Sequence, residues 1–263
     1  MENTQVIIVG ELSKGELASH TYELSTLGAN LSSEVTCVVS VSSSNSNFDR
    51  EIAKGELGTY GISSMHCVDC GEGLSGNSLA SYIKTLIDGI ELNSENVIVL
   101  APQTYLGRDV MAHLSVFVDR NVLTNAINVS NSDGGVKTTH MVFGGTKIVT
   151  AESGNGSIHL VGVRPKSIAP NKSNEPKECE VVDAHAGDQL QDSAKTKIVS
   201  REVIQSVGPE LDEASIVISG GRGVGSQENY ESLIQGCADV LGAASGASRA
   251  IVDAGWVPYS KQV

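Results

Sequence analysis

Positive charge is scarce in this sequence of 263 residues. It contains 18 Lys and Arg residues against 31 Asp and Glu residues, which gives a formal net charge of -13. A nucleic-acid backbone and an anionic lipid surface both require a basic protein surface. The charge balance therefore predicts that nucleic acid is not a partner, and it favours a soluble chain that meets another protein.

Long apolar runs are missing as well. No run approaches the roughly 18 residues that a membrane-spanning helix needs. The N-terminus, Met1-Glu2-Asn3-Thr4, lacks the basic region of a secretory leader. We therefore expect no direct membrane insertion and a cytoplasmic location.

Cysteine is too sparse for a disulfide framework. The five cysteines (Cys37, Cys67, Cys70, Cys179 and Cys237) are odd in number and scattered, which fits reduced thiols in the cytoplasm. A lone Cys-x-x-Cys at Cys67 and Cys70 lacks the second pair, or the two histidines, that a zinc site recruits. We interpret these two cysteines as residues in or beside a strand, and we predict no metal site.

Catalytic motifs are missing too. The six histidines are isolated, and neither a Gly-x-Ser-x-Gly elbow nor a His-Glu-x-x-His motif occurs. The sequence therefore gives little support for nucleophilic or acid/base catalysis, and we predict no catalytic residues.

What the first 120 residues do contain is a regular alternation of apolar runs and amphipathic segments. Continuous apolar strands that alternate with helices are typical of a parallel sheet covered on both faces. The predicted strands are 5–9, 34–39, 65–68 and 96–100, and the predicted helices are 16–27, 48–57, 79–90 and 107–118.

The pattern changes after about residue 121. Short β-like runs, divided by Gly, Ser, Asn and Asp, predict a small antiparallel insertion over about 121–205. Residues 169–177, with two prolines and polar neighbours, are predicted to form a flexible surface loop. The predicted strands are 122–129, 140–143, 147–150, 157–163, 179–182 and 195–203, with turns at 133–135, 144–145 and 154–156.

A glycine-rich loop, Ser219-Gly220-Gly221-Arg222-Gly223, follows the apolar run 215–218 and precedes a long amphipathic segment. Unhindered backbone N–H groups at a helix start, with an arginine above them, suit a phosphate or diphosphate. The spacing matches neither the Gly-x-Gly-x-x-Gly fingerprint nor a P-loop. The alternative is an ordinary glycine-rich turn.

A second cluster, Gly246-Ala247-Ser248-Arg249-Ala250, is followed by Val252-Asp253-Ala254-Gly255-Trp256-Val257-Pro258. Small neighbours leave the Ser248 hydroxyl and the Arg249 guanidinium in open space at the carboxyl edge of a sheet, where ligands of open α/β sheets bind. The alternative makes Arg249 a surface residue that pairs with Asp253 one helical turn on.

Residues 101–109 are a third loop of interest, since they follow an apolar run and open a predicted helix. They could form a ligand loop. A simple strand-to-helix turn, with Asp109 favourable in the first helical turn, explains them equally well.

Read together, these two C-terminal clusters, Glu228-Asn229 and the final Gln262-Val263 resemble, in order and spacing, the electron transfer flavoprotein alpha subunit. The family pairs an alpha with a beta subunit around one FAD. It carries electrons from primary dehydrogenases, such as acyl-CoA dehydrogenases, to an acceptor such as a membrane quinone oxidoreductase. The resemblance implies an α/β N-terminal domain (1–205) with the β insertion, and then a partial doubly wound FAD-binding domain (206–263).

The resemblance also implies which residues touch FAD. Arg222 lies against the cofactor, Ser248 binds it, and Arg249 stands near the isoalloxazine ring, where its charge would raise the reduction potential. The implied cofactor-binding set is Gly221, Arg222, Gly223, Ser248, Arg249, Gln262 and Val263.

The sequence departs from the family pattern after Gln262-Val263, where the family continues with further FAD-binding motifs. The resemblance therefore implies an FAD domain that is incomplete at its C-terminus. Two rivals stay open: a nucleotide-binding protein of the adenine-nucleotide hydrolase type, and a flavin-free structural partner of a beta subunit.

Overall fold

The computed structural model describes residues 4–41, 47–71, 75–90, 96–132, 135–153, 156–185, 199–200, 211 and 214–263. The chain divides into two compact units, Met1–Val199 and Ser200–Val263. Each unit has a sheet and a hydrophobic core of its own. The predicted domain boundary at residue 205 falls in the stretch 201–210, which lies outside the described residues.

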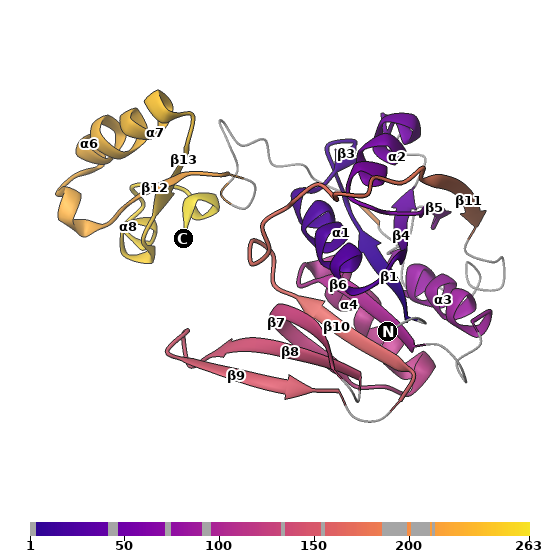
Figure 1. Ribbon diagram of the computed structural model, residues 1–263. Coiled ribbons are helices and arrows are strands. Elements are labelled where there is room, and N and C mark those ends of the chain that lie inside the picture. The colour runs from indigo at the N-terminus through magenta and orange to yellow at the C-terminus, as the bar shows by residue number, and fades with distance from the viewer. Residues whose placement is uncertain are drawn as a thin grey trace. The chain divides into compact units, whose positions relative to one another are not determined.

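The first unit is built on a nine-stranded sheet in the order β11-β5-β4-β1-β6-β10-β7-β8-β9 (Figure 1). Every neighbouring pair from β11 to β7 is parallel. The strands of this part are β1 (Thr4–Gly10), β4 (Glu34–Val41), β5 (Ser64–Asp69), β6 (Asn96–Pro102), β10 (Ile158–Val163), β11 (Glu180–His185) and β7 (Val122–Ser132).

Helices cover both faces of this sheet, as the alternation of apolar runs and amphipathic segments predicts. Val6 and Ile8 of β1 belong to the core cluster formed with α1 and α2, whereas Ile7 and Val9 belong to the cluster formed with α3 and α4. A strand that buries successive side chains on opposite faces is typical of a parallel sheet. The helices are α1 (Ser19–Leu31), α2 (Arg50–Thr59), α3 (Ser75–Asp88) and α4 (Tyr105–Val118).

The helix predicted to begin at residue 16 begins at Ser19 instead. Lys14 and Gly15 have positive φ angles of 54° and 88°. They turn the chain so that β3 (Glu16–Leu17) pairs with β2 (Leu12–Ser13) in a small hairpin. A local turn therefore overrides the helical spacing of the apolar side chains at this point.

The antiparallel part consists of β7, β8 (Gly135–Val142) and β9 (Lys147–Glu152). Gly144 and Gly145 have positive φ angles of 65° and 87° and make the predicted turn between β8 and β9. These strands extend the edge of the main sheet through the pairing of β7 with β10. The predicted turn residues 133–134 and 154–155 lie outside the described residues.

Two segments assigned to the antiparallel insertion were predicted wrongly. The segment 157–163 contains β10 (Ile158–Val163), which runs parallel between β6 and β7, and the segment 179–182 contains the start of β11 (Glu180–His185), which runs parallel to β5. Leu160, Val161 and Val163 are all buried, so both faces of β10 are covered. This is the burial pattern of a central strand in a parallel sheet, not that of an edge strand. Of the predicted strand 195–203, the structure describes only 199–200, which form no strand.

The segment 169–177 is a surface loop without helix or strand, as its prolines and polar residues predict, and hydrogen bonds attach it to the neighbouring helices. Asn171 donates its N–H to Thr26 Oγ1 at 2.9 Å. Ser173 and Lys177 donate theirs to the carbonyl oxygens of Thr59 and Gly58, also at 2.9 Å. The chain needs a long crossover to pass from β10 to the far edge strand β11, and these bonds fasten that crossover to α1 and α2.

The cysteine pair has the structure that the sequence predicts. Cys67 lies within β5, Cys70 follows the end of the strand, and both are buried and free. Burial raises the pKa of both thiols, which keeps them in the unreactive protonated form. None of the described helices combines the length and the apolar character that crossing a bilayer requires.

The second unit contains two parallel strands, β12 (Val217–Gly220) and β13 (Ala244–Ala247). Its small core is made by Tyr230, Ala247, Ile251 and Val257. The sequence predicts β12 but misses β13, because alanine, serine and glycine have little intrinsic preference for a strand. The helical elements are η2 (Arg222–Val224), α6 (Gln227–Asn229), the π-helical η3 (Tyr230–Gln235), α7 (Gly236–Leu241), α8 (Arg249–Asp253) and η4 (Tyr259–Lys261).

His159 of β10 makes the first unit sensitive to acid. Its side chain is buried, Nδ1 lies 2.7 Å from Ser153 Oγ, and Nε2 has no hydrogen-bond partner in the described part of the chain. Burial, and secondarily the charge of Arg120, lowers the pKa of His159. The unfolded chain therefore takes up the proton more readily, so folding stability is present above the unfolded pKa of about 6.5 and is lost as the pH falls below it.

We expect the His159→Gln variant to lose less stability than the original chain between neutral pH and about pH 5, because no buried imidazole has to be charged. Urea unfolding followed by circular dichroism at several pH values measures this difference. The variant His113→Gln, at a partly exposed position on α4, controls for the general loss of an imidazole. Equal pH slopes for His159→Gln and the original chain would contradict the prediction.

Candidate functional site

The carboxyl edge of the β12–β13 sheet is where the predicted site residues gather. Gly220, the last residue of β12, pairs with Ala247, the last residue of β13. The loops that follow therefore start side by side, at Gly221 and Ser248. The Ser248 N–H donates to the Gly220 carbonyl oxygen at 2.9 Å and ties the two loop starts together.

The glycine-rich loop forms a short 3-10 turn, η2. The N–H groups of Val224 and Gly225 donate to the carbonyl oxygens of Gly221 and Arg222, each at 3.0 Å. This pattern leaves the N–H groups of Arg222 and Gly223 without an acceptor inside the turn. The Arg222 side chain is exposed, so a guanidinium and backbone donors lie together on this loop.

The two glycines of the predicted set have different surroundings. A Cβ atom at Gly221 would lie 3.0 Å from Ser248 Oγ, whereas a Cβ atom at Gly223 would meet nothing within 4 Å. Gly221 therefore allows the two loops to approach each other closely. Gly223 keeps the outer side of the turn open to a ligand.

Ser248 and Arg249 begin α8. Among the described residues, the Ser248 hydroxyl makes no capping hydrogen bond to this helix. Arg249 Nε lies 3.2 Å from Asp253 Oδ2, with the two side chains 79% and 64% exposed. The alternative contact to Asp253 is therefore real, but an exposed ion pair of this kind contributes little stability.

The final residues return to the same edge. Val263 donates its N–H to the Ala247 carbonyl oxygen at 3.0 Å, and Gln262 forms a parallel bridge with Ala247. A Cβ atom at Gly246 would lie 2.7 Å from Val263 Cγ1, so only glycine leaves room for this return. The structure thus brings the whole predicted set, from Gly221 to Val263, to one edge.

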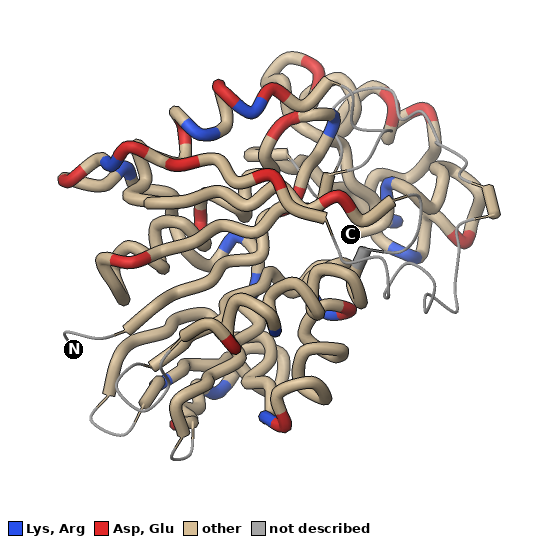
Figure 2. Tube along the Cα trace, turned by 90° about the vertical axis from the view of Figure 1, so that its right-hand side faces the viewer, with Lys and Arg blue, Asp and Glu red and all other residues tan. Residues whose placement is uncertain are grey.

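Positive charge at this edge is unusual for such an acidic chain. Figure 2 marks Asp and Glu in red and Lys and Arg in blue, and red positions predominate along the chain. Arg222 and Arg249 nevertheless both follow the strand ends at the site. Guanidinium groups, backbone N–H donors and a hydroxyl that does not cap its own helix together suit an anionic ligand such as a diphosphate.

Two residues outside the predicted cofactor-binding set support the site. The Asn229 side chain donates to the Val224 carbonyl oxygen at 2.7 Å and fixes the end of the glycine-rich loop. Lys261 holds the segment before Gln262 through contacts with Gln235 and Ser245. The resemblance already singled out Asn229, but no local pattern marks Lys261.

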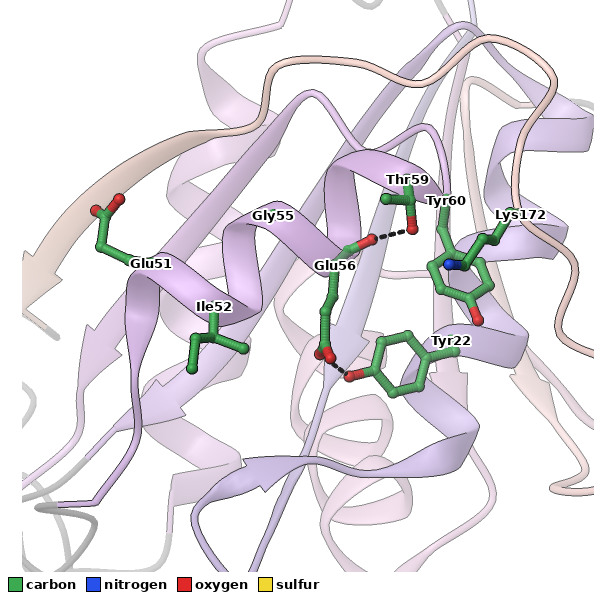
Figure 3. A pocket seen from close by; sticks show the side chains of 8 residues that line it. All are labelled: Tyr22, Glu51, Ile52, Gly55, Glu56, Thr59, Tyr60 and Lys172. Carbon is green, nitrogen blue, oxygen red and sulfur yellow. Dashed lines mark hydrogen bonds between the residues drawn. The ribbon is translucent and has the colours of Figure 1, made fainter.

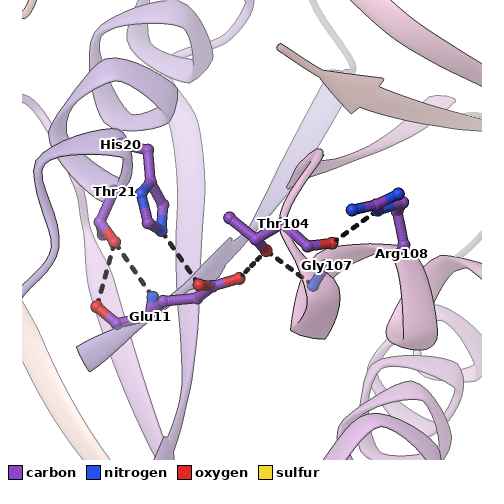
Figure 4. Close-up of polar contacts among 6 residues, drawn as sticks. All are labelled: Glu11, His20, Thr21, Thr104, Gly107 and Arg108. Carbon is purple, nitrogen blue, oxygen red and sulfur yellow. Dashed lines mark hydrogen bonds and ion pairs between the residues drawn. The ribbon is translucent and has the colours of Figure 1, made fainter. Parts of the chain in front are cut away.

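The third predicted loop, 101–109, lies in the first unit at the point where strand order reverses between β1 and β6. Ligands of open α/β sheets bind at such a point. Here the Thr104 hydroxyl donates to the Glu11 carboxylate, whose other oxygen lies 3.1 Å from His20 Nε2 (Figure 4). A carboxylate of the chain itself lies at this point, which favours the simple turn. The placement of Asp109 in the first helical turn was predicted wrongly, because α4 begins at Tyr105 and its first turn contains no acidic residue. Asp109 lies 3.6 Å from His113 Nε2.

A hollow of about 400 Å³ opens between α1, α2 and the crossover segment (Figure 3). The Tyr22 hydroxyl donates to Glu56, and burial raises the pKa of Tyr22. The rings of Tyr22 and Tyr60 lie 5.1 Å apart, between centroids. None of the residues predicted to form the site lines this hollow.

Comparisons with known proteins agree with this arrangement. Residues 6–188 match the family model described as "Electron transfer flavoprotein domain", and residues 210–263 match "Electron transfer flavoprotein FAD-binding domain". Similar proteins include "Electron transfer flavoprotein subunit alpha" of Mycobacterium leprae, which is 33% identical over 70% of this chain and 56% of that protein. The protein of the same name from Bacillus subtilis is 28% identical over 98% of this chain and 76% of that protein.

"Protein FixB" of Azorhizobium caulinodans is 30% identical over 70% of this chain and 49% of that protein. In several of these matches the chain spans about half the length of the relative. The matched segments include both units, and the FAD-binding match contains the whole predicted set at the carboxyl edge of β12–β13. The chain therefore belongs to the electron transfer flavoprotein family, among its alpha subunits.

Proposed function

We propose that this chain is the alpha subunit of an electron carrier and that its second unit binds FAD. The observation that carries the proposal is the convergence of Gly221, Arg222, Ser248, Arg249 and Gln262 at one sheet edge. That edge lies inside the segment matched by the family's FAD-binding domain. The same edge is the expected ligand position of an α/β sheet.

The chemical groups at this edge suit the diphosphate and the other polar groups of FAD. Arg222 and the backbone of Gly221 and Gly223 would hold the diphosphate, which needs cationic and N–H donors. The Ser248 hydroxyl would bind the cofactor directly, and Gln262 and Val263 would continue the wall beside β13. FAD, when bound, supplies the reversible uptake of electrons.

Arg249 would lie near the isoalloxazine ring. A fixed guanidinium there stabilises negative charge on the reduced cofactor and so raises its reduction potential. The exposed contact with Asp253 leaves the other guanidinium nitrogens available for this role. We infer that the chain acts as a carrier without a substrate of its own.

We further propose that the partner is an electron transfer flavoprotein beta subunit. Large apolar side chains stand exposed at the outer edge of the first unit's sheet, with Ile148 of β9 69% accessible and Phe143 of the β8–β9 turn 76% accessible. Exposed apolar groups along an edge strand are characteristic of a surface that another protein covers. The donors would be acyl-CoA dehydrogenases or related dehydrogenases, and the acceptor a membrane quinone oxidoreductase.

We place this pair in the cytoplasm, because the five cysteines are free thiols of the kind that a reducing compartment maintains. Two alternatives from the sequence are kept as outcomes of the test. The nucleotide-hydrolase alternative is weakened by the Glu11 carboxylate at the strand-order reversal of the first unit.

The test is to purify the chain together with a beta subunit and to record the visible spectrum. We expect bound-flavin absorption at about one FAD per pair, and loss of this absorption from the Arg222→Gln, Ser248→Ala double variant of the chain. A stable pair without flavin would identify a structural partner instead. ATP turnover by the chain alone would overturn both assignments in favour of the hydrolase.

A further inference from the structure

A polar cluster in the second unit joins three segments that are distant in sequence. Lys261 Nζ donates to Gln235 Oε1 at 2.5 Å and to Ser245 Oγ at 2.8 Å. Ser245 Oγ in turn donates to Gln235 Oε1 at 2.7 Å. Ser245 is buried, and Lys261 and Gln235 are half-buried. None of these residues belongs to the predicted cofactor set.

The fold determines the geometry of this cluster. Gln235 is the last residue of the π-helical turn η3, and its Nε2 donates to Asp239 Oδ1 at 2.7 Å. That bond turns the amide oxygen toward Lys261 and Ser245. The Tyr230 hydroxyl, at the other end of η3, donates to the Gly246 carbonyl oxygen at 3.1 Å and anchors the turn on β13. A widened turn of this kind is frequent at functional sites.

Lys261 occupies a particular place in the chain. It ends the short turn η4 and immediately precedes Gln262 and Val263, which lie beside Ala247 at the carboxyl edge. The backbone bonds of η4 are local, from Lys261 to Pro258 and from Gln262 to Tyr259. They close the turn itself. Beyond it, the Val263 N–H bonds to the Ala247 carbonyl oxygen, and the Lys261 side chain adds a second attachment, to η3 and β13.

We infer that Lys261 is a positioning residue, whose ammonium fastens η4 to η3 and β13 and thereby places Gln262 and Val263 at the cofactor edge. The inference rests on the proposed function for the role of these two residues. A charged donor with two neutral oxygen acceptors forms stronger hydrogen bonds than neutral pairs do. Partial burial strengthens these bonds further, because less water competes for the ammonium.

The first test measures amide hydrogen exchange by NMR in the full chain and in the Lys261→Met variant, which keeps side-chain length and removes the charge. We expect the Val263 N–H, which bonds to Ala247, to exchange roughly tenfold faster in the variant, as the loss of one charge-assisted bond predicts. The N–H groups of Ala244 and Ser248, which join β12 to β13, are expected to keep their rates.

The outcomes separate positioning from general stabilisation. Equal acceleration at Val263, Ala244 and Ser248 would show that Lys261 only stabilises the unit, and an unchanged Val263 rate would overturn the inference outright. Lys261→Arg, which retains a cationic donor, is expected to restore the protection of Val263. Lys172→Met, at an exposed position of the first unit, is the control for the loss of a lysine.

The second test measures FAD affinity of the pair by equilibrium titration. We expect Lys261→Met to weaken binding roughly tenfold, and Lys261→Arg to recover most of the affinity. Faster Val263 exchange with unchanged FAD affinity would overturn the link to the cofactor edge. Failure of the original pair to bind FAD would instead refute the proposed function, and the exchange experiment would still decide whether Lys261 fastens η4.

Discussion

Replacing Arg249 with alanine is expected to lower the reduction potential of the flavin in the purified pair by roughly 50 mV. The reason is electrostatic. At an effective permittivity of about 20, a unit charge stabilises an opposite charge by about 4 kcal/mol at 4 Å and by half of that at twice the distance. For a two-electron couple, 1.4 kcal/mol corresponds to about 30 mV. Redox titration followed by visible absorbance measures the shift.

Asp253→Asn is the matched control for this prediction. It keeps the shape of the neighbouring side chain but removes the carboxylate that lies 3.2 Å from Arg249 Nε. The potential should then rise or stay constant, because the guanidinium charge is no longer partly offset. An unchanged reduction potential in a flavin-loaded Arg249→Ala pair would refute the proposed effect of the Arg249 charge. A lower potential in Asp253→Asn would contradict the expected direction of that effect.

Replacing Gly107 with alanine is expected to destabilise the first unit by about 3 kcal/mol. Alanine normally stabilises a helix more than glycine does. At Gly107, however, a Cβ atom would lie 1.9 Å from the Pro102 carbonyl oxygen, which is backbone and cannot swing away as a side chain could. The start of α4 would have to move off the end of β6, and the capping bond from the Gly107 N–H to Thr104 Oγ1, now 3.0 Å, would be lost.

The variant Gly55→Ala in α2 is expected to stabilise the first unit instead. A Cβ atom there would meet nothing within 4 Å. The variant should therefore gain the usual helix preference of about 0.5–1 kcal/mol. Urea unfolding of both variants, followed by circular dichroism, measures the two changes. Equal stability of Gly107→Ala and the original chain would show that α4 tolerates a shifted start and would refute the prediction.

The predicted site shows what local sequence can indicate. Glycines around Arg222 imply a close backbone approach, and small residues around Ser248 imply an accessible hydroxyl. Both features are local, so the chain displays them without reference to any fold. Lys261 shows the limit: its partners Gln235 and Ser245 lie 26 and 16 residues away in sequence, and no spacing rule connects them.

The fold divides in a similar way. Apolar runs such as 5–9 and 96–100 predict central parallel strands because burial on both faces demands continuous apolar side chains. The same argument applies to β10, whose Leu160 and Val161 are equally buried. The short β-like runs next to it in the sequence, however, indicated an antiparallel insertion. β13 carries no signal of its own, since its small side chains become strand only through pairing with β12.

The sequence by itself thus determined most classes of element in the first unit and the acidic character of the chain, and it supplied the prediction of a glycine- and arginine-rich anion site. Only the tertiary structure decided the strand order, the parallel placement of β10 and β11, and the return of Val263 to the edge of β13. The physical reason is the separation in sequence over which each interaction acts. Periodicity and side-chain size act between neighbours in sequence, whereas strand pairing is chosen by the burial and hydrogen bonds that distant segments gain together.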